Sequence, residues 1–97
     1  MVRFEWDAHK NNLNKRKHGI LFEEAESVFL DENAQLIHDP DHSEMEDRFI
    51  LLGRSCRAHL LLICHCYREN EEVIRIISAR KATRHEQKQY LNQKGHL

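Results

Sequence analysis

The residues best suited to chemistry lie in one short stretch towards the C-terminal end of the chain, residues 75–86. It carries three arginines and a lysine: Arg75, Arg80, Lys81 and Arg84. A guanidinium group is a planar fork of donors that holds a phosphate group through two parallel hydrogen bonds and stays charged at any working pH. The stretch therefore predicts a phosphate-handling site. The alternative is a set of exposed cations that merely flank a central strand.

A helix-start signal closes the same stretch. Thr83 and Glu86 have the spacing of a capping box, in which the threonine side chain and the carboxylate each bond the other residue's backbone amide. We therefore interpret Glu86 as a cap in preference to a general base, and we expect Arg80 in the turn between a strand and this helix. Because free amides at a helix N-terminus favour anions, phosphate contact is expected from Arg80, with Lys81 and Arg84 beside it.

Arg75 belongs to the preceding strand. Residues of opposite parity point to opposite faces of a regular strand, so Arg75 and Arg80 share a face only if the strand ends or bulges between them. Both remain candidates for stabilising negative charge on a phosphate.

A second basic cluster ends the first predicted helix, residues 7–18, where cations complement the negative end of the helix dipole and Gly19 suits a left-handed closing position. Lys17 or His18 is able to supply proton transfer if this helix ends beside the arginines. Histidine titrates in the useful range, whereas lysine needs a lowered pKa or acts only as a cation.

Other reactive side chains give weaker signals. His38, Asp39 and His42 offer ligands for a divalent metal ion, but with eight histidines in 97 residues such proximity is expected by chance, so no metal site is predicted. Cys64 and Cys66 share one strand face and are expected to pack in the core. Trp6 is either a core residue or a platform on which a base stacks.

Length and composition narrow the class of protein. At 97 residues, 40% hydrophobic and 32% charged, the chain predicts one soluble globular domain, residues 1–97. It shows neither a long apolar run nor a basic start followed by an apolar segment, so no membrane span or secretory signal is predicted. Three cysteines, an odd number without zinc-ligand spacing, indicate a reduced, cytoplasmic protein.

The net charge of −1 hides a strong segregation of charge along the chain. Residues 1–20 carry five Lys/Arg and two acids, residues 21–47 carry ten acids and no Lys/Arg, and residues 48–97 carry ten Lys/Arg and four acids. A polyanion is drawn to the basic segments if the fold unites them, while the acidic middle faces elsewhere or meets a basic partner.

Hydrophobic periodicity predicts an α+β fold with the order β-α-α-β-β-β-β-α and a twisted, mostly antiparallel sheet partly covered by helices. The first helix is expected to dock through Leu13 and the last through Tyr90 and Leu91. The final three strands have short connections, which favours an antiparallel meander. The predicted strands are residues 2–6, 34–38, 48–54, 59–67 and 73–79, the helices are 7–18, 22–30 and from 83 onward, and residues 39–47 form an exposed loop.

Blocks spread over nearly the whole chain resemble the BrnT toxins of bacterial type II toxin–antitoxin systems. They are Phe4–Asp7, Lys10, Asn11, Asn14, Lys17–Ile20, Phe22–Ala25, His42, Ser43, Glu46, Arg48, Arg75–Arg80 and Glu86. The resemblance implies a compact RelE-like fold, a ribonuclease activity that blocks translation, and neutralisation by a cognate BrnA-type antitoxin that also binds operator DNA. No cofactor is implied.

Metal-independent RNA cleavage needs a base that helps the 2′-hydroxyl attack the adjacent phosphate, cations that stabilise the added charge, and an acid for the departing 5′-oxygen. Arg80 and Arg75, assisted by Arg84, are the candidates for charge stabilisation, and Lys17 or His18 for proton transfer. Two other classes of function stay open: an interaction module whose basic groove binds an acidic partner without turnover, and a small metal-dependent hydrolase using His38, Asp39 and His42.

Overall fold

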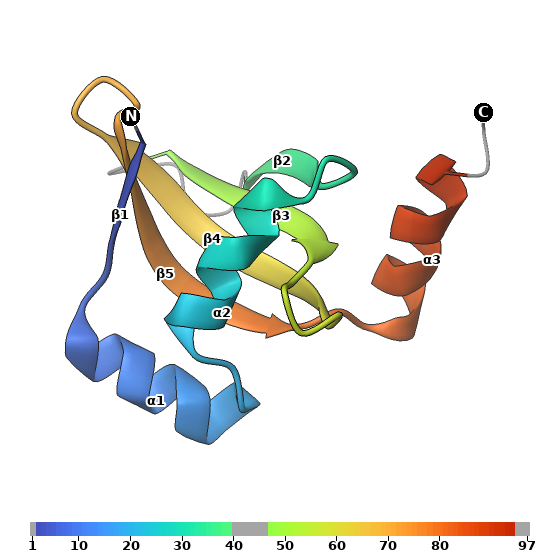
Figure 1. Ribbon diagram of the computed structural model, residues 1–97, viewed down its shortest axis with the longest axis horizontal. Coiled ribbons are helices and arrows are strands. Elements are labelled where there is room, and N and C mark those ends of the chain that lie inside the picture. The colour runs from blue at the N-terminus through green and yellow to red at the C-terminus, as the bar shows by residue number, and fades with distance from the viewer. Residues whose placement is uncertain (1, 40–46, 95–97) are drawn as a thin grey trace.

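The computed structural model describes residues 2–39 and 47–94, and in this part of the chain five strands form one sheet with helices around it (Figure 1). The elements are β1 (Arg3–Glu5), α1 (Ala8–His18), α2 (Phe22–Ser27), the 3-10 turn η1 (Val28–Leu30), β2 (Gln35–Asp39), β3 (Arg48–Arg54), β4 (Leu60–Arg68), β5 (Val73–Lys81) and α3 (Arg84–Lys94). The predicted fold class and element order are confirmed. The exposed-loop prediction largely falls on residues 40–46, which lie outside the described residues, and Asp39 belongs to β2.

The strands are ordered β1-β5-β4-β3-β2 across the sheet. The pairs β2–β3, β3–β4 and β4–β5 are antiparallel, as the predicted meander requires, and β1 pairs with β5 in parallel. In the described residues, no helix is long and apolar enough to span a membrane.

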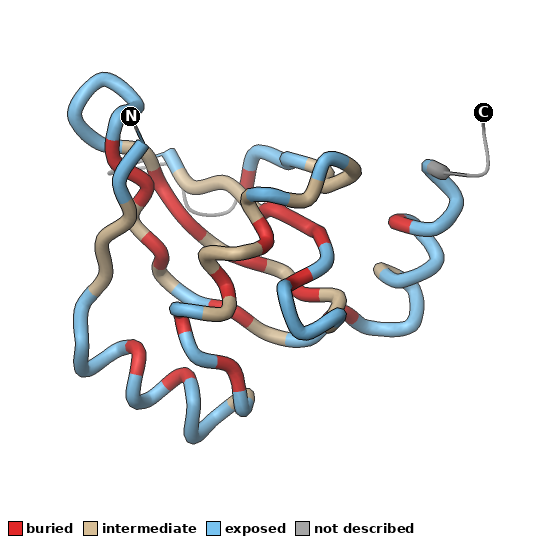
Figure 2. The backbone as a smooth tube through the Cα atoms, viewed as in Figure 1, coloured by how far each residue is buried: buried red, intermediate tan, exposed pale blue. Residues whose placement is uncertain are grey.

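The main core lies between the sheet and α2. The second helix supplies Phe22 and Ala25 and the turn η1 supplies Val28, all fully buried, and the strands supply Leu51, Leu61, Ile63, Ile76 and Ala79. Figure 2 shows these buried positions as red segments along the strands and the helices packed on them. Burial of each large apolar side chain stabilises the fold by about 1.5–3 kcal/mol. We call this side of the sheet the helix-covered face.

The first helix docks differently from the prediction. Leu13 is 43% exposed, and the buried residues of α1 are Asn11 and Asn14. The Asn14 side-chain amide donates to the carbonyl oxygens of Ile20 and Ala79, both at 2.8 Å, and its oxygen accepts from the Ala79 backbone N–H at 3.0 Å. Since β1 pairs with β5 only as far as residue 75, the later backbone groups of that edge need partners, and Asn14 supplies them. Leu13 was thus the wrong anchor.

The predicted ends of α1 are confirmed. The Asp7 side chain accepts from the Lys10 backbone N–H at 3.1 Å, and this bond is the main cause that lowers the pKa of Asp7. Gly19 closes the helix in the left-handed conformation, φ 74°, and its N–H bonds the Lys15 carbonyl at 2.8 Å. The basic end of α1 is therefore held in a fixed position.

The last helix lies at one end of the sheet (Figure 1), where it buries Tyr90 and forms hydrogen bonds to residues 33 and 35 through Gln89 and Gln93. Tyr90 is 1% exposed, packs against Leu52 and Ala82, and donates from its hydroxyl to Asp31 at 2.7 Å. The prediction of Leu91 as a second anchor was wrong, because Leu91 is 53% exposed. Its position one residue after Tyr90 turns it about 100° around the helix, away from the sheet.

Candidate active site

The strand that carries the arginines is longer than predicted. β5 continues to Lys81, with Arg80 opposite Leu62 and Lys81 opposite Leu61 of β4. The expectation that Arg80 lies in the strand-to-helix turn was therefore wrong. A capping box marks where a helix begins, but it does not show where the preceding strand ends, and the ladder with β4 holds these two residues in the sheet.

A one-residue shift of register resolves the parity of the two arginines. Cys64 pairs with Ser78 while His65 pairs with Ile76, so β5 contains one extra residue, Ile77. Ile76 and Ala79, three positions apart, accordingly both face the core. The shift places Arg75 and Arg80 together on the opposite side of the sheet, which we call the open face. Arg75 and Arg80 thus share a face because β5 bulges between them, which is one of the two possibilities given by the sequence analysis.

A small cavity of about 110 Å³ opens on this face beside Arg80. It is lined by His18, Ile50, Leu62, Cys64, Ser78, Ala79 and Arg80. His18 reaches it because Asn14 holds α1 along the edge of β5 at Ala79, so the next turn of the helix ends beside Arg80. The structure therefore brings His18 and Arg80 to one cavity from segments about sixty residues apart in sequence.

Arg80 is held in place by a carboxylate. Its Nη1 and Nη2 donate to the two oxygens of Glu86 at 2.9 and 3.0 Å, and the Thr83 backbone N–H donates to Glu86 at 2.8 Å. Chiefly through the hydrogen bonds from Arg80, the pKa of Glu86 falls to about 2, and the same contact raises the pKa of Arg80. The capping geometry predicted for Glu86 is present, since the Glu86 N–H donates to the Thr83 hydroxyl at 3.2 Å. Glu86 also orients the guanidinium.

Arg75 has different surroundings. Its Nη1 donates to Glu5 of β1 at 2.7 Å, and Arg68 of β4 approaches the same carboxylate at 3.8 Å. Arg75 and Arg80 pair with Cys66 and Leu62, four residues apart on β4, so at a rise of about 3.3 Å per residue their Cα atoms are separated by about 13 Å. The two arginines therefore lie on the same face of the sheet but at different positions along β5.

The remaining predicted residues lie around this site rather than in its cavity. Lys17, Lys81 and Arg84 are exposed cations on the neighbouring segments. Trp6 is half-buried, packs against the core and meets the Phe22 ring edge-on at a centroid distance of 6.0 Å. The structure thus gives Trp6 a packing role away from the residues that line the cavity.

Three residues at the site were not predicted to belong to it: Asn14 and Ser78 had no predicted role, and Cys64 was expected to pack in the core. Asn14 positions α1, and its only sequence signal is the spacing from Asn11, three residues earlier on the same helix face. Cys64 and Ser78 line the cavity and contact each other. Burial raises the pKa of the Cys64 thiol, so this group is protonated at neutral pH and is a poor nucleophile.

The metal-binding alternative gains no support from the described residues. His38 Nε2 is 3.5 Å from Asp47 Oδ1, Asp39 is buried, and His42 lies outside the described part of the chain. Within residues 2–39 and 47–94, no group of three His, Cys, Asp or Glu side chains is placed to hold a metal ion.

Comparison with known proteins defines first the fold and then the family. The crystal structure of the Brucella abortus ribonuclease toxin, BrnT, superimposes with a TM-score of 0.65 and 21% sequence identity over 87% of this chain and 100% of that chain. No curated protein sequence matches the chain. Residues 6–86 match the family model of the ribonuclease toxin, BrnT, of type II toxin–antitoxin systems. The chain therefore belongs to the BrnT family of ribonuclease toxins.

Membership in this family establishes the general activity. The protein is an endoribonuclease toxin of a type II toxin–antitoxin system, which implies an RNA substrate and a cognate antitoxin. The arginines of the open face are suited to such a polyanionic substrate.

Proposed function

We propose that the open face of the sheet cleaves RNA without a metal ion, with Arg80 and His18 at the scissile phosphate. The observation that carries this proposal is the shared cavity, where a permanently charged guanidinium and a titratable imidazole meet. The bulge at Ile77 and the Asn14 contacts to Ala79 support it, because both features bring these two side chains together.

In the proposed step the phosphoryl group passes from the 5′-oxygen of one nucleotide to the 2′-oxygen of the preceding one. The 2′-oxygen attacks the adjacent phosphorus and loses its proton to a base, the bond from phosphorus to the 5′-oxygen breaks, and an acid gives that oxygen a proton, leaving a 2′,3′-cyclic phosphate and a 5′-hydroxyl. His18 transfers protons in this step, and Lys17, its neighbour, acts as a cation or as a second proton-transfer group. Arg80 stabilises the negative charge that develops on the phosphoryl oxygens.

Arg80 retains donors for this task. A guanidinium has five N–H groups, and the contacts of Arg80 within the described residues use three: two to Glu86 and one to the Lys81 carbonyl. Two N–H groups therefore remain to donate to phosphate oxygens, while Glu86 keeps the plane of the guanidinium fixed. Pre-orientation of this kind lowers the reorganisation needed in the transition state.

The other cations of the site bind neighbouring phosphates. Arg75 is too far along β5 to act at the same phosphate as Arg80, so it holds the chain of the substrate at a second position. Arg84 extends this positive surface at the start of α3, and Lys81, which follows Arg80 in β5 and faces the other side of the sheet, adds a cation at the same end of the strand. Trp6 is left out of the set because it packs against Phe22.

The proposed biological setting follows from the family. The toxin cleaves RNA in the bacterial cytoplasm and thereby inhibits translation, a BrnA-type antitoxin neutralises it, and operator DNA is bound only through that antitoxin. The chain's own basic surface is used for RNA.

The test is cleavage of a single-stranded RNA by the purified protein in buffer with excess EDTA. We expect cleavage by the wild type, and a loss of about a hundredfold in rate for Arg80→Ala, as for removal of one electrostatic contact to the transition state. His18→Ala is expected to lose activity and to alter the pH profile. Arg57→Ala, an exposed arginine of the β3–β4 loop, is the matched control and should cleave at the wild-type rate.

Two results contradict this proposal. Cleavage that appears only after a divalent metal ion is added excludes the metal-independent step. Binding of RNA by the folded wild type without any cleavage, in EDTA or with metal, indicates the non-catalytic interaction module instead.

A further inference from the structure

A second surface lies on the other side of the sheet from Arg80. Its centre is a cavity of about 700 Å³, lined by Leu36, Asp47, Phe49, Tyr67, Arg68, Glu69, Asn70 and Glu71. We call it the acidic groove. Phe49 and Tyr67 pack edge-to-face at 5.3 Å, and Phe49 stacks near the buried His65 of the helix-covered face. The groove therefore opens beyond the helices on that face.

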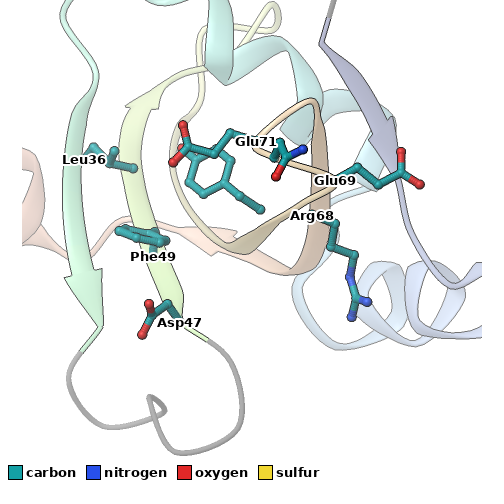
Figure 3. Close-up of a pocket in the computed structure, with 8 residues that line it drawn as sticks. Leu36, Asp47, Phe49, Arg68, Glu69 and Glu71 are labelled. Atoms are coloured by element: carbon teal, nitrogen blue, oxygen red, sulfur yellow. The ribbon is translucent and has the colours of Figure 1, made fainter.

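The floor of the groove is apolar and its rim is negative. In Figure 3, Leu36 lies opposite Phe49, Glu71 points across the groove, and Arg68 and Glu69 point away from it. The latter two are engaged elsewhere, because Glu69 pairs with Arg3 and Arg68 approaches Glu5.

The remaining carboxylates that line the groove are those of Asp47, which also lies 3.5 Å from His38 Nε2, and Glu71. Burial and the Glu71 carboxylate both raise the pKa of the Tyr67 phenol, in agreement with the position of Glu71 above the floor. The residues that line this groove thus combine aromatic surface with two carboxylates, which suits the stem and head of an arginine or lysine side chain.

The strand beside the groove is the last of the sheet. Among the described strands β2 pairs only with β3, so its outer side forms a sheet edge. Leu36 and Ile37 point to opposite faces of this strand and are 53% and 41% exposed. An exposed edge with apolar side chains is a template for an added strand from another chain.

Charge decides which kind of partner fits. Asp47 and Glu71 make the lining of the groove negative, so it repels RNA and attracts a basic protein segment. A second copy offers a basic segment at the end of α1, but that contact would be head-to-tail and would leave the groove of one copy open. A basic partner that meets the toxin one to one is the better fit.

We propose that the acidic groove and the β2 edge together form the docking surface for a basic, extended segment of the cognate antitoxin. The segment adds a strand to β2 and places one arginine or lysine between Asp47 and Glu71, over Phe49 and Tyr67. The identity of the partner rests on the neutralisation proposed above. Because the groove lies on the side of the sheet opposite Arg80, this contact anchors the antitoxin without using the residues that cleave RNA.

The experiment measures the affinity of the purified toxin for the purified antitoxin by calorimetry. The double variant Asp47→Asn, Glu71→Gln removes the two charges without changing side-chain size, and we expect its affinity to fall at least about tenfold, equal to about 1.4 kcal/mol. The salt dependence of binding should become shallower as well. Glu72→Gln is the matched control, since it removes an exposed carboxylate one residue further along and outside the groove, and it should bind like the wild type.

A second variant tests the groove without relying on the first. Leu36→Lys places a cation at an exposed position of the groove, and we expect it to weaken binding by repelling the basic segment. Both variants should cleave RNA at the wild-type rate when the antitoxin is absent, because the open face is unchanged.

The outcomes separate this proposal from the proposed function. Unchanged affinity in both groove variants overturns the docking surface, as does a loss of binding in Arg75→Ala alone, which places the antitoxin on the open face. Self-association of the wild type that disappears in the double variant identifies a second copy as the occupant and also overturns it. A wild type that fails to cleave RNA overturns the proposed function, whereas the comparison of affinities still stands.

Discussion

The two ends of β5 on the open face differ although they carry the same kind of residue. At one end Arg80 is surrounded by α1 and the start of α3, shares a cavity with His18, and orients against a carboxylate whose pKa is about 2. At the other end Arg75 lies beside β1 and contacts Glu5, which is 43% exposed. Residue type alone does not define a reactive position. A reactive position is defined by the side chains that neighbouring elements bring to it, and these side chains distinguish Arg80 from Arg75.

Two features of the backbone create the Arg80 end. The extra residue Ile77 turns Arg80 to the open face, and Asn14 fixes the end of α1 beside it. Neither Ile77 nor Asn14 is charged or reactive.

The largest effect on stability is expected from Asn14→Ala, which removes the hydrogen bonds that hold α1 beside Arg80. The substitution leaves the Ala79 N–H and two carbonyl oxygens without their buried partner, so the free energy of unfolding should fall by about 3 kcal/mol. Chemical denaturation measures this change. Asn12→Ala, at an exposed position of the same helix, is the control and should change stability by less than about 0.5 kcal/mol. Equal effects of the two variants would contradict the role given to Asn14.

A smaller effect is expected from Glu86→Gln. At neutral pH the variant should lose about 1 kcal/mol of stability, a value kept small because Arg80 is 41% exposed and the pair is screened by solvent. The pKa of Glu86 in the folded protein, about 2, lies below its ordinary value of 4.5, so its ionisation stabilises the fold above pH 4.5 and this contribution is lost as the pH falls towards 2.

The pH dependence sharpens the comparison of the two ends. The difference in stability between the wild type and Glu86→Gln should therefore shrink between pH 4.5 and pH 2, measured by thermal or chemical unfolding. Glu5→Gln, the equivalent change at the Arg75 end, is expected to cost less stability at neutral pH, because Glu5 is 43% exposed. A larger effect at Glu5 would reverse the comparison.

The smallest effect is expected from Arg75→Ala on RNA binding. Loss of one phosphate contact should lower the affinity severalfold and make the salt dependence shallower by about 0.7 in the logarithmic slope, as for a single strand. Binding titrations at several salt concentrations measure both changes. Arg57→Ala serves as the control for nonspecific loss of charge, and an equal change in that variant would remove Arg75 from the binding surface.

The sequence predicted those features that depend on neighbouring residues. The capping residues Asp7 and Glu86, the closing Gly19 and the apolar stripe from Phe22 to Val28 all act over a few positions, and each was predicted correctly. The order of elements followed from the same local patterns. The arginines of β5 were also identified as candidate phosphate-binding residues, because the charge of an arginine is known from the sequence alone.

The features that the sequence did not predict depend on long-range contacts. Ile76 and Ile77 are both apolar, so nothing in the pattern shows which of them is the extra residue of β5. Leu13 is the obvious apolar anchor of α1, yet the helix meets a sheet edge with unpaired backbone groups, and Asn14 is the residue that satisfies them. The position of His18 beside Arg80 follows from that contact. The sequence predicted a role for His18 only on the condition that the first helix ends beside the arginines.

In the proposed mechanism Arg80 acts on the reacting phosphate and Arg75 on a neighbouring one. The most direct test is the single-turnover rate of RNA cleavage in EDTA, with enzyme in saturating excess, for Arg80→Ala and Arg75→Ala. We expect Arg80→Ala to be slower than the wild type by about a hundredfold even when all RNA is bound, and Arg75→Ala to regain nearly the wild-type rate at saturation. A wild-type rate for Arg80→Ala, or a larger loss for Arg75→Ala, would contradict the claim.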